Sequence, residues 1–87
     1  MATVTATLKQ RGKTHGKFSD TANAEQELRD WLREQEGWEQ LSASQRCALD
    51  MIVHKMARIM CGNPNFADHW HDIQGYAQLV EQELEDN

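Results

Sequence analysis

The 87-residue chain has one proline, two cysteines and no long apolar run. Its longest uncharged stretch is far too short to cross a bilayer. The threonine-rich start "MATVTATLKQ" lacks the apolar segment of a signal peptide, so we expect a cytoplasmic protein. Cys47 and Cys61 are too far apart for a CxxC motif. We expect both to be small core residues rather than a disulfide or a zinc pair.

Positive charge is scarce, because nine Lys and Arg stand against fourteen Asp and Glu, for a net charge of −5. Phosphate backbones require clustered cations, so this balance argues against nucleic acid as the main partner. Four of the nine cations fall within residues 9–17, which hold no acid. This segment is either a solvated arm or a local contact for phosphate.

An apolar content of 39% and a charged content of 26% are typical of a globular chain, and the length allows one domain at most. So short a chain buries a modest share of its surface and is marginally stable alone. We therefore expect a homo-oligomer, or a chain that folds against a partner.

Strand signals are weak, whereas helical periodicity is clear. It predicts an all-α fold, a small bundle with main helices over 19–36, 43–61 and 67–84. A basic segment, 1–18, precedes them and could include a short helix over 2–11. Short connections favour antiparallel neighbours.

Several residues are suited to begin or end these helices. Ser19 or Asp20 is expected to cap the first helix with its side-chain oxygen. Ser42 and Gln45 have the spacing of a capping box before the second helix. Gly62 is expected to end that helix as a left-handed cap.

Apolar residues recur at spacings of three and four and predict the buried faces. Two loop residues, Trp38 and Leu41, are expected to anchor the loop against the core. The predicted stripes comprise Ala24, Leu28, Trp31 and Leu32 on the first helix, Ala48, Met51, Ile52, Met56, Ile59 and Met60 on the second, and Trp70, Ile73, Ala77, Val80 and Leu84 on the third.

The run "FADHWHDIQGYAQL", residues 66–79, holds the densest chemistry. On a helical wheel Asp68 and Asp72 fall on one flank, one turn apart, with Tyr76 between Asp72 and the core. Two carboxylates so placed are suited to a hard cation or to a basic group.

The histidines of the same run do not share that flank. The wheel places His69 near the buried face and His71 almost opposite. Zinc requires ligands that converge, so we expect no zinc site and a surface role for His71.

The second helix supplies cations that would complement the acidic flank. Lys55 and Arg58 lie at the rim of its apolar stripe. They either pair with Asp68 and Asp72 in an ion-pair network, or line a pocket in which the cations meet phosphate and the aspartates hold a divalent ion.

Three runs together resemble a small phage and prophage domain family of uncharacterised function. They are "RGKTHGKF" (11–18), "ALDMIVHKMARIMCGNPN" (48–65) and "DHWHDIQGYAQL" (68–79). The family pattern is approximately R-G-x-x-[HY]-G-x-F, then K-x-x-R-I, then D-x-x-x-D-I-x-G-Y-A. More remotely, the chain is similar to phage nucleotide-modification-associated domains and to all-α pyrophosphatases of the MazG and dimeric dUTPase type.

This resemblance implies an oligomeric, helical protein of a bacterial host's cytoplasm that binds a nucleotide with Mg²⁺. If it is an enzyme, it is a metal-dependent nucleotide pyrophosphohydrolase. Phe18 completes the first motif. The resemblance implies that Asp68 and Asp72 bind the metal, that they act in catalysis with Lys55, and that Arg58, Tyr76, Arg11 and His15 bind the nucleotide.

The chain departs from the pyrophosphatases in two spacings. Their earlier helix carries E-x-x-E and their later one E-x-x-D, where this chain has Glu27-x-x-Asp30 and a D-x-x-x-D pair. The alternative hypothesis is a non-catalytic interaction protein that binds or inhibits a host or defence protein. An open cleft with converging carboxylates would favour the nucleotide hypothesis, and complete pairing of Asp68, Asp72 and Lys55 the alternative.

Overall fold

The computed structural model describes residues 12–86, and the fold it shows is all-α, as predicted. The three main helices are α2 (Phe18–Glu34), α3 (Ala43–Cys61) and α4 (Ala67–Asp86). A short 3-10 helix, η1 (Glu36–Gln40), lies between α2 and α3, and a helical turn over 12–15 precedes α2. Arg11 and the helix predicted over 2–11 lie outside the described residues.

Helix α2 begins one residue before its predicted start and ends two residues before its predicted end. Neither Ser19 nor Asp20 caps it, so that prediction was wrong. The N-cap is Lys17, in extended conformation and without a side-chain cap bond. Instead, the hydroxyl of Thr21 donates to the Lys17 carbonyl and lies equally close to that of His15, tying the first turn to the preceding segment.

Helix α3 has the predicted bounds, and its capping box is confirmed. The Gln45 amide donates to the Ser42 hydroxyl oxygen, and the Ser42 amide donates to the Gln45 side chain. Before it, η1 brings Trp38 to a buried position, where it is 8% exposed. The predicted anchor is therefore confirmed for Trp38, and Leu41 is half-buried.

Gly62 ends α3, but not as the predicted left-handed cap, because its φ is −122°. The glycine is required there by packing. A Cβ on Gly62 would lie 2.6 Å from the backbone of Thr14, His15 and Gly16. Gly16 faces the Cys61 carbonyl in the same way and adopts a φ of 86°, the left-handed region that favours glycine.

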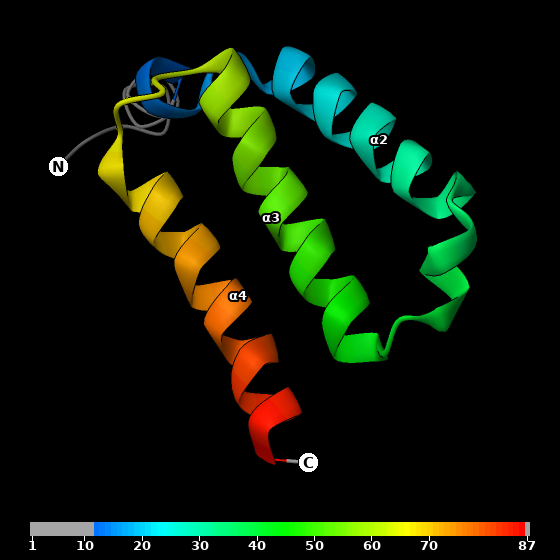
Figure 1. The fold of residues 1–87 in the computed structure, drawn as a ribbon. Coiled ribbons are helices and arrows are strands. Elements are labelled where there is room, and N and C mark those ends of the chain that lie inside the picture. The colour runs from blue at the N-terminus through cyan, green and yellow to red at the C-terminus, as the bar shows by residue number, and fades with distance from the viewer. Residues whose placement is uncertain (1–11, 87) are drawn as a thin grey trace, which may run out of the picture.

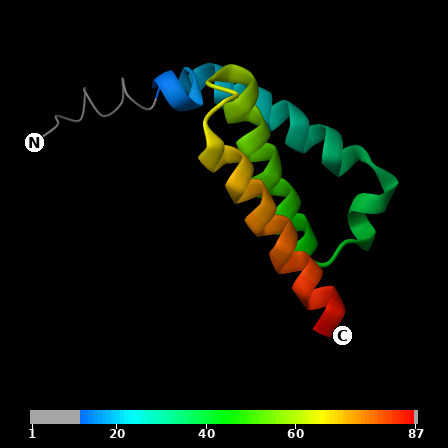
Figure 2. The ribbon, with the colours of Figure 1, turned by 60° about the vertical axis from the view of Figure 1, so that its left-hand side comes forward.

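The helices form one layer with α3 in the middle (Figure 1). Helix α4 runs antiparallel to α3 along its length, and α2 diverges from α3 towards its own C-terminal end, from which η1 leads back to the start of α3 (Figure 2). None of the helices within residues 12–86 has the length and apolar character needed to traverse a bilayer.

The core of this layer is small. Ala48 and Ile59 are buried as predicted, and Val53 and Ala57 are buried beside them. Other residues of the predicted stripes are exposed, because a single layer leaves one side of each helix uncovered. Cys47 is also exposed, contrary to the expected core position, and Cys61 is half-buried. The stripe residues for which burial was wrongly predicted are Trp31, Met56, Met60, Trp70, Ala77 and Leu84.

Candidate functional site

Lys55 and Asp72 join α3 to α4. The Lys55 ammonium lies 2.8 Å from Oδ2 of Asp72. The lysine side chain is 12% exposed and the aspartate side chain 42%, so the ammonium is desolvated while the carboxylate still meets water. Of the ion-pair network considered for this flank, this contact is the pair that forms.

The ion pair changes the acidity of Asp72. The hydrogen bond from Lys55 lowers the pKa of the Asp72 carboxyl, and partial desolvation opposes that effect. The charges of Lys55, His71 and His69 lower the same pKa further. Asp72 is therefore ionised at neutral pH, and its carboxylate forms an ion pair with Lys55.

Three of the other predicted site residues, Asp68, Arg58 and Tyr76, do not converge on this pair. Asp68 is exposed and makes no ion pair with any residue in 12–86. Arg58 is half-buried and likewise has no ion pair within that range. Tyr76 is half-buried and lines a separate groove towards the C-terminal end of α4, beside Leu79 and Val80.

The predicted magnesium site is not assembled within the described part of the chain. No group of three or more His, Cys, Asp or Glu side chains there could hold a metal ion. One of the two proposed ligands, Asp72, is already engaged by Lys55. Mg²⁺ is usually bound through one or two carboxylates together with substrate phosphates, so a site for it here would depend on Asp68, on Asp72 released from Lys55, and on the substrate.

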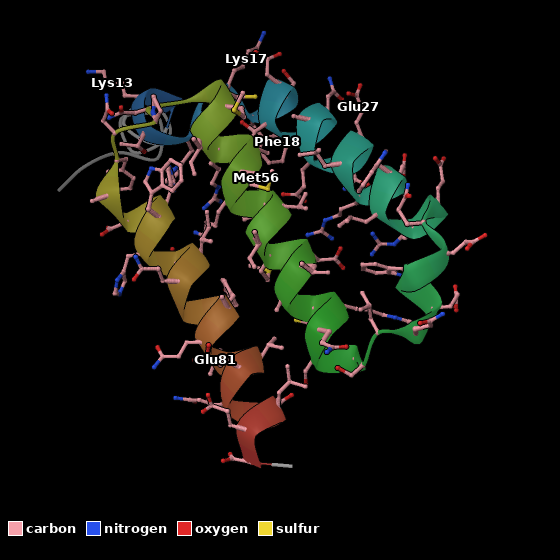
Figure 3. All side chains as sticks on the ribbon, in the orientation of Figure 1. Lys13, Lys17, Phe18, Glu27, Met56 and Glu81 are labelled. Atoms are coloured by element: carbon pink, nitrogen blue, oxygen red, sulfur yellow. The ribbon has the colours of Figure 1, made fainter. Side chains whose placement is uncertain are left out.

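The carboxylates of α2 are too remote to complete such a site. Glu27 and Asp30 are exposed on α2, and α3 lies between that helix and α4. Figure 3 shows Glu27 on the outer side of α2. Among residues 12–86, these two acids therefore do not face Asp68 and Asp72.

Thr14 and His15 of the N-terminal motif pack against His69 and Phe66. His69 is 1% exposed, as expected for the buried face, and its Nε2 lies 3.1 Å from the Thr14 carbonyl and 3.2 Å from Nδ1 of His15. A carbonyl only accepts, so His69 Nε2 carries the proton. Phe66 packs edge-on against both rings. His15 is thus positioned by His69, away from the acidic flank.

A second polar network, which the sequence analysis missed, joins α2 to α3. Arg33 donates to both carboxylate oxygens of Asp50, at 3.2 and 2.9 Å. Glu25 contacts the His54 ring and lies 3.3 Å from Arg29. The available signal was the four-residue spacing of Glu25, Arg29 and Arg33 on α2, matched by Asp50 and His54 on α3.

These polar contacts define one side of the layer. The Lys55–Asp72 and Arg33–Asp50 ion pairs and the Ser44–Glu83 hydrogen bond fasten α3 to its neighbours on this side, which we call the polar face.

The opposite side is apolar and uncovered. Steps of about 100° per residue place its members roughly 80–160° around their helices from the residues of the polar face. Figure 3 labels one of them, Met56, on α3. The exposed members of this apolar face are Trp31 on α2, Met56 and Met60 on α3, and Trp70 and Leu84 on α4.

Comparison of the chain with protein-family models, curated proteins and solved structures finds no match.

Proposed function

We propose that this protein is a non-catalytic interaction protein, and that a second copy of the chain covers its apolar face. One observation carries the proposal. Residues whose spacing predicts burial, Met56, Met60, Trp70 and Leu84 among them, are exposed together on one side of the three-helix layer. Large contiguous apolar surfaces of this kind mark interaction sites.

The size of the face supports a stable interface. Met60 is 79% exposed, Trp31 59% and Trp70 51%. With Met56 and Leu84, the exposed parts of these side chains amount to roughly 600 Å², given the area of large side chains. The half-buried Leu49 and Ile73 border them. A stable interface buries about 800 Å² on each partner, so the face is close to sufficient.

The charge distribution favours a second copy as the occupant. A chain of net charge −5 repels itself, and docking two copies would oppose like charges on most surfaces. The residues that make the apolar face carry no charge, and Glu27 and Glu81, which Figure 3 labels, lie at its edges, about one turn from Trp31 and Leu84. Two copies can therefore meet here in an isologous contact whose centre is uncharged and whose carboxylates stay at the rim.

The association state tests this proposal directly, and α4 offers a matched pair of variants. Leu84 lies on the apolar face and Leu79 on the other flank of the same helix, and they are 61% and 60% exposed. We expect sedimentation velocity to show a dimer for the unaltered chain and for Leu79→Glu. We expect Met60→Glu and Leu84→Glu to sediment as monomers, because each places a carboxylate inside the contact.

Two results would overturn the proposal. A monomer at 100 µM protein would show that no second copy covers the face, and a heterologous protein would become the candidate occupant. Equal dissociation by Leu79→Glu and Leu84→Glu would show that the contact does not use the apolar face. Helical content measured by circular dichroism establishes that each variant is folded.

Nucleotide binding with Mg²⁺ at Asp68 and Asp72 is the competing proposal, and it has a distinct signature. It requires a thermal stabilisation by nucleotide that depends on Mg²⁺ and that Asp72→Asn abolishes. The interaction proposal predicts no such stabilisation, since Asp72 pairs with Lys55 and no metal cluster forms among residues 12–86.

A further inference from the structure

A pocket lined by arginines lies on the polar face, between α2, η1 and the first half of α3. Its volume is about 620 Å³. Three of its lining side chains are Arg29 and Arg33 of α2 and Arg46 of α3. Asp50 is the acid among the lining residues. The pocket contains none of the residues that the sequence analysis assigned to a site.

The Trp38 side chain lines the pocket and contacts two of these arginines. The guanidinium carbon of Arg33 lies 4.8 Å from the centre of a Trp38 ring, and that of Arg46 lies 5.7 Å from it. Arg46 also donates to the backbone carbonyls of Trp38 and Glu39. Cation–π contact and hydrogen bonds thus fix both guanidinium groups before any ligand arrives.

Arg29 contributes an unsatisfied donor. Its Nε atom is buried and has no hydrogen-bond partner among residues 12–86. One Nη of the same side chain contacts Glu25 and, at 3.5 Å, the Asp50 carbonyl. A buried donor without a partner is costly, and an ordered water or a bound ion is one way in which native proteins satisfy it.

We infer that this pocket binds a phosphate group. Its lining carries three guanidinium groups and, as the one carboxylate among the lining residues, Asp50. From outside the lining, Glu25 pairs with Arg29 at 3.3 Å with its side chain 15% exposed, and Glu39 lies 3.7 Å from Arg46 with its side chain 85% exposed, so Arg46 is the arginine whose charge is least neutralised. The planar donors of guanidinium groups suit phosphate oxygens, which can accept from two of them at once.

In this arrangement Asp50 acts as an internal competitor for the arginines. It occupies both Nη atoms of Arg33, in the way that a phosphate would. Removing its charge should therefore tighten phosphate binding, whereas loss of Arg33 should weaken it. This opposite pair of effects separates a binding pocket from an ion pair that serves stability alone.

The test is an NMR titration of the ¹⁵N-labelled full chain with inorganic phosphate at low ionic strength. The Nε–H signal of Arg29 and the indole N–H signal of Trp38 report on the pocket. We expect saturable shifts of both. Arg33→Gln should weaken phosphate binding about tenfold or more, and Asp50→Asn should tighten it several-fold. Arg58→Gln, which makes the same charge change outside the pocket, should leave it unchanged.

Several outcomes would overturn the assignment. They are the absence of saturable shifts at 20 mM phosphate, an equal loss of binding in Arg58→Gln, and weaker binding in Asp50→Asn. Equal affinity for acetate would reassign the pocket to carboxylates. The pocket lies opposite the apolar face, so the monomeric Met60→Glu variant should bind phosphate as the unaltered chain does. Failure of the dimer and failure of this site are therefore distinguishable.

Discussion

Gly16 and Gly62 bring the N-terminal segment against the end of α3 with no side chain between the two backbones. Because a Cβ on Gly62 would meet backbone atoms at 2.6 Å, neither side can yield without moving the chain. We expect Gly62→Ala to lower the free energy of unfolding by about 2–3 kcal/mol, the cost of forcing packed backbone apart. Urea denaturation followed by circular dichroism measures it.

Gly75 provides the matched control, since it is exposed within α4 and a Cβ there meets nothing within 4 Å. Gly75→Ala should raise stability by about 0.5–1 kcal/mol, as alanine is the better helix former. Equal effects of the two substitutions would show that the close approach at Gly62 does not constrain the fold.

The lowered pKa of Asp72 leads us to expect that the stability of the fold depends on pH. Its folded-state pKa is lowered by Lys55, so its contribution to stability is present above the usual carboxyl pKa of about 4. That contribution is lost as the pH falls through the lower, folded-state pKa. We expect Asp72→Asn to be less stable than the unaltered chain at pH 7, and the difference to vanish once the pH is below the folded-state pKa.

Asp68→Asn is the control for this effect, because Asp68 lies one turn away and has no ion pair with the described residues. Its thermal unfolding midpoint should follow that of the unaltered chain between pH 2 and pH 7. A pH-independent deficit in Asp72→Asn would mean that the amide disturbs packing and that the charge of Asp72 does not stabilise the fold.

At the scale of helices, the sequence correctly predicted features that depend on residues close together in the chain. The periodicity of α3 and the Ser42–Gln45 capping box depend on residues within a few positions of one another, and both were confirmed. The conformation of Gly62 depends on contact with Gly16 and its neighbours, about fifty residues earlier in the chain, and there the local prediction was wrong. The cap of α2 was also wrongly predicted, because the Thr21 hydroxyl bonds the backbone of the segment just before the helix. Long-range packing is not encoded in helical spacing.

The candidate site was likewise predicted in part and missed in part. The wheel correctly separated His69, which is buried, from the exposed His71. It also placed Asp72 where Lys55 reaches it. It gave no means of predicting which helix α2 would contact, so the arginines around Trp38 were missed. That pocket requires η1 to fold back between α2 and α3.

At the scale of the whole molecule, the sequence pattern predicts burial for apolar residues that the single chain leaves exposed. A dimer would bury them. The amphipathic pattern assigns Met56, Met60 and Trp70 to a core, yet one layer of helices supplies no second layer to cover them. Two layers packed through their apolar faces would supply it. The buried residues of one chain, chiefly Val53, Ala57 and Ile59 with Trp38, make a core too small to expect high stability alone.

It follows that folding and association should be coupled, and the thermal midpoint should depend on protein concentration. Mass action favours the dimer as concentration rises, and for a domain of this size a hundredfold increase should raise the midpoint by about 5–10 °C. Differential scanning fluorimetry between 1 and 100 µM measures this rise. Met60→Glu, which places a carboxylate in the apolar face, should unfold at a midpoint that does not change with concentration. A midpoint independent of concentration in the unaltered chain would mean that the single layer is stable without a second copy, and that its apolar face is held for a different partner.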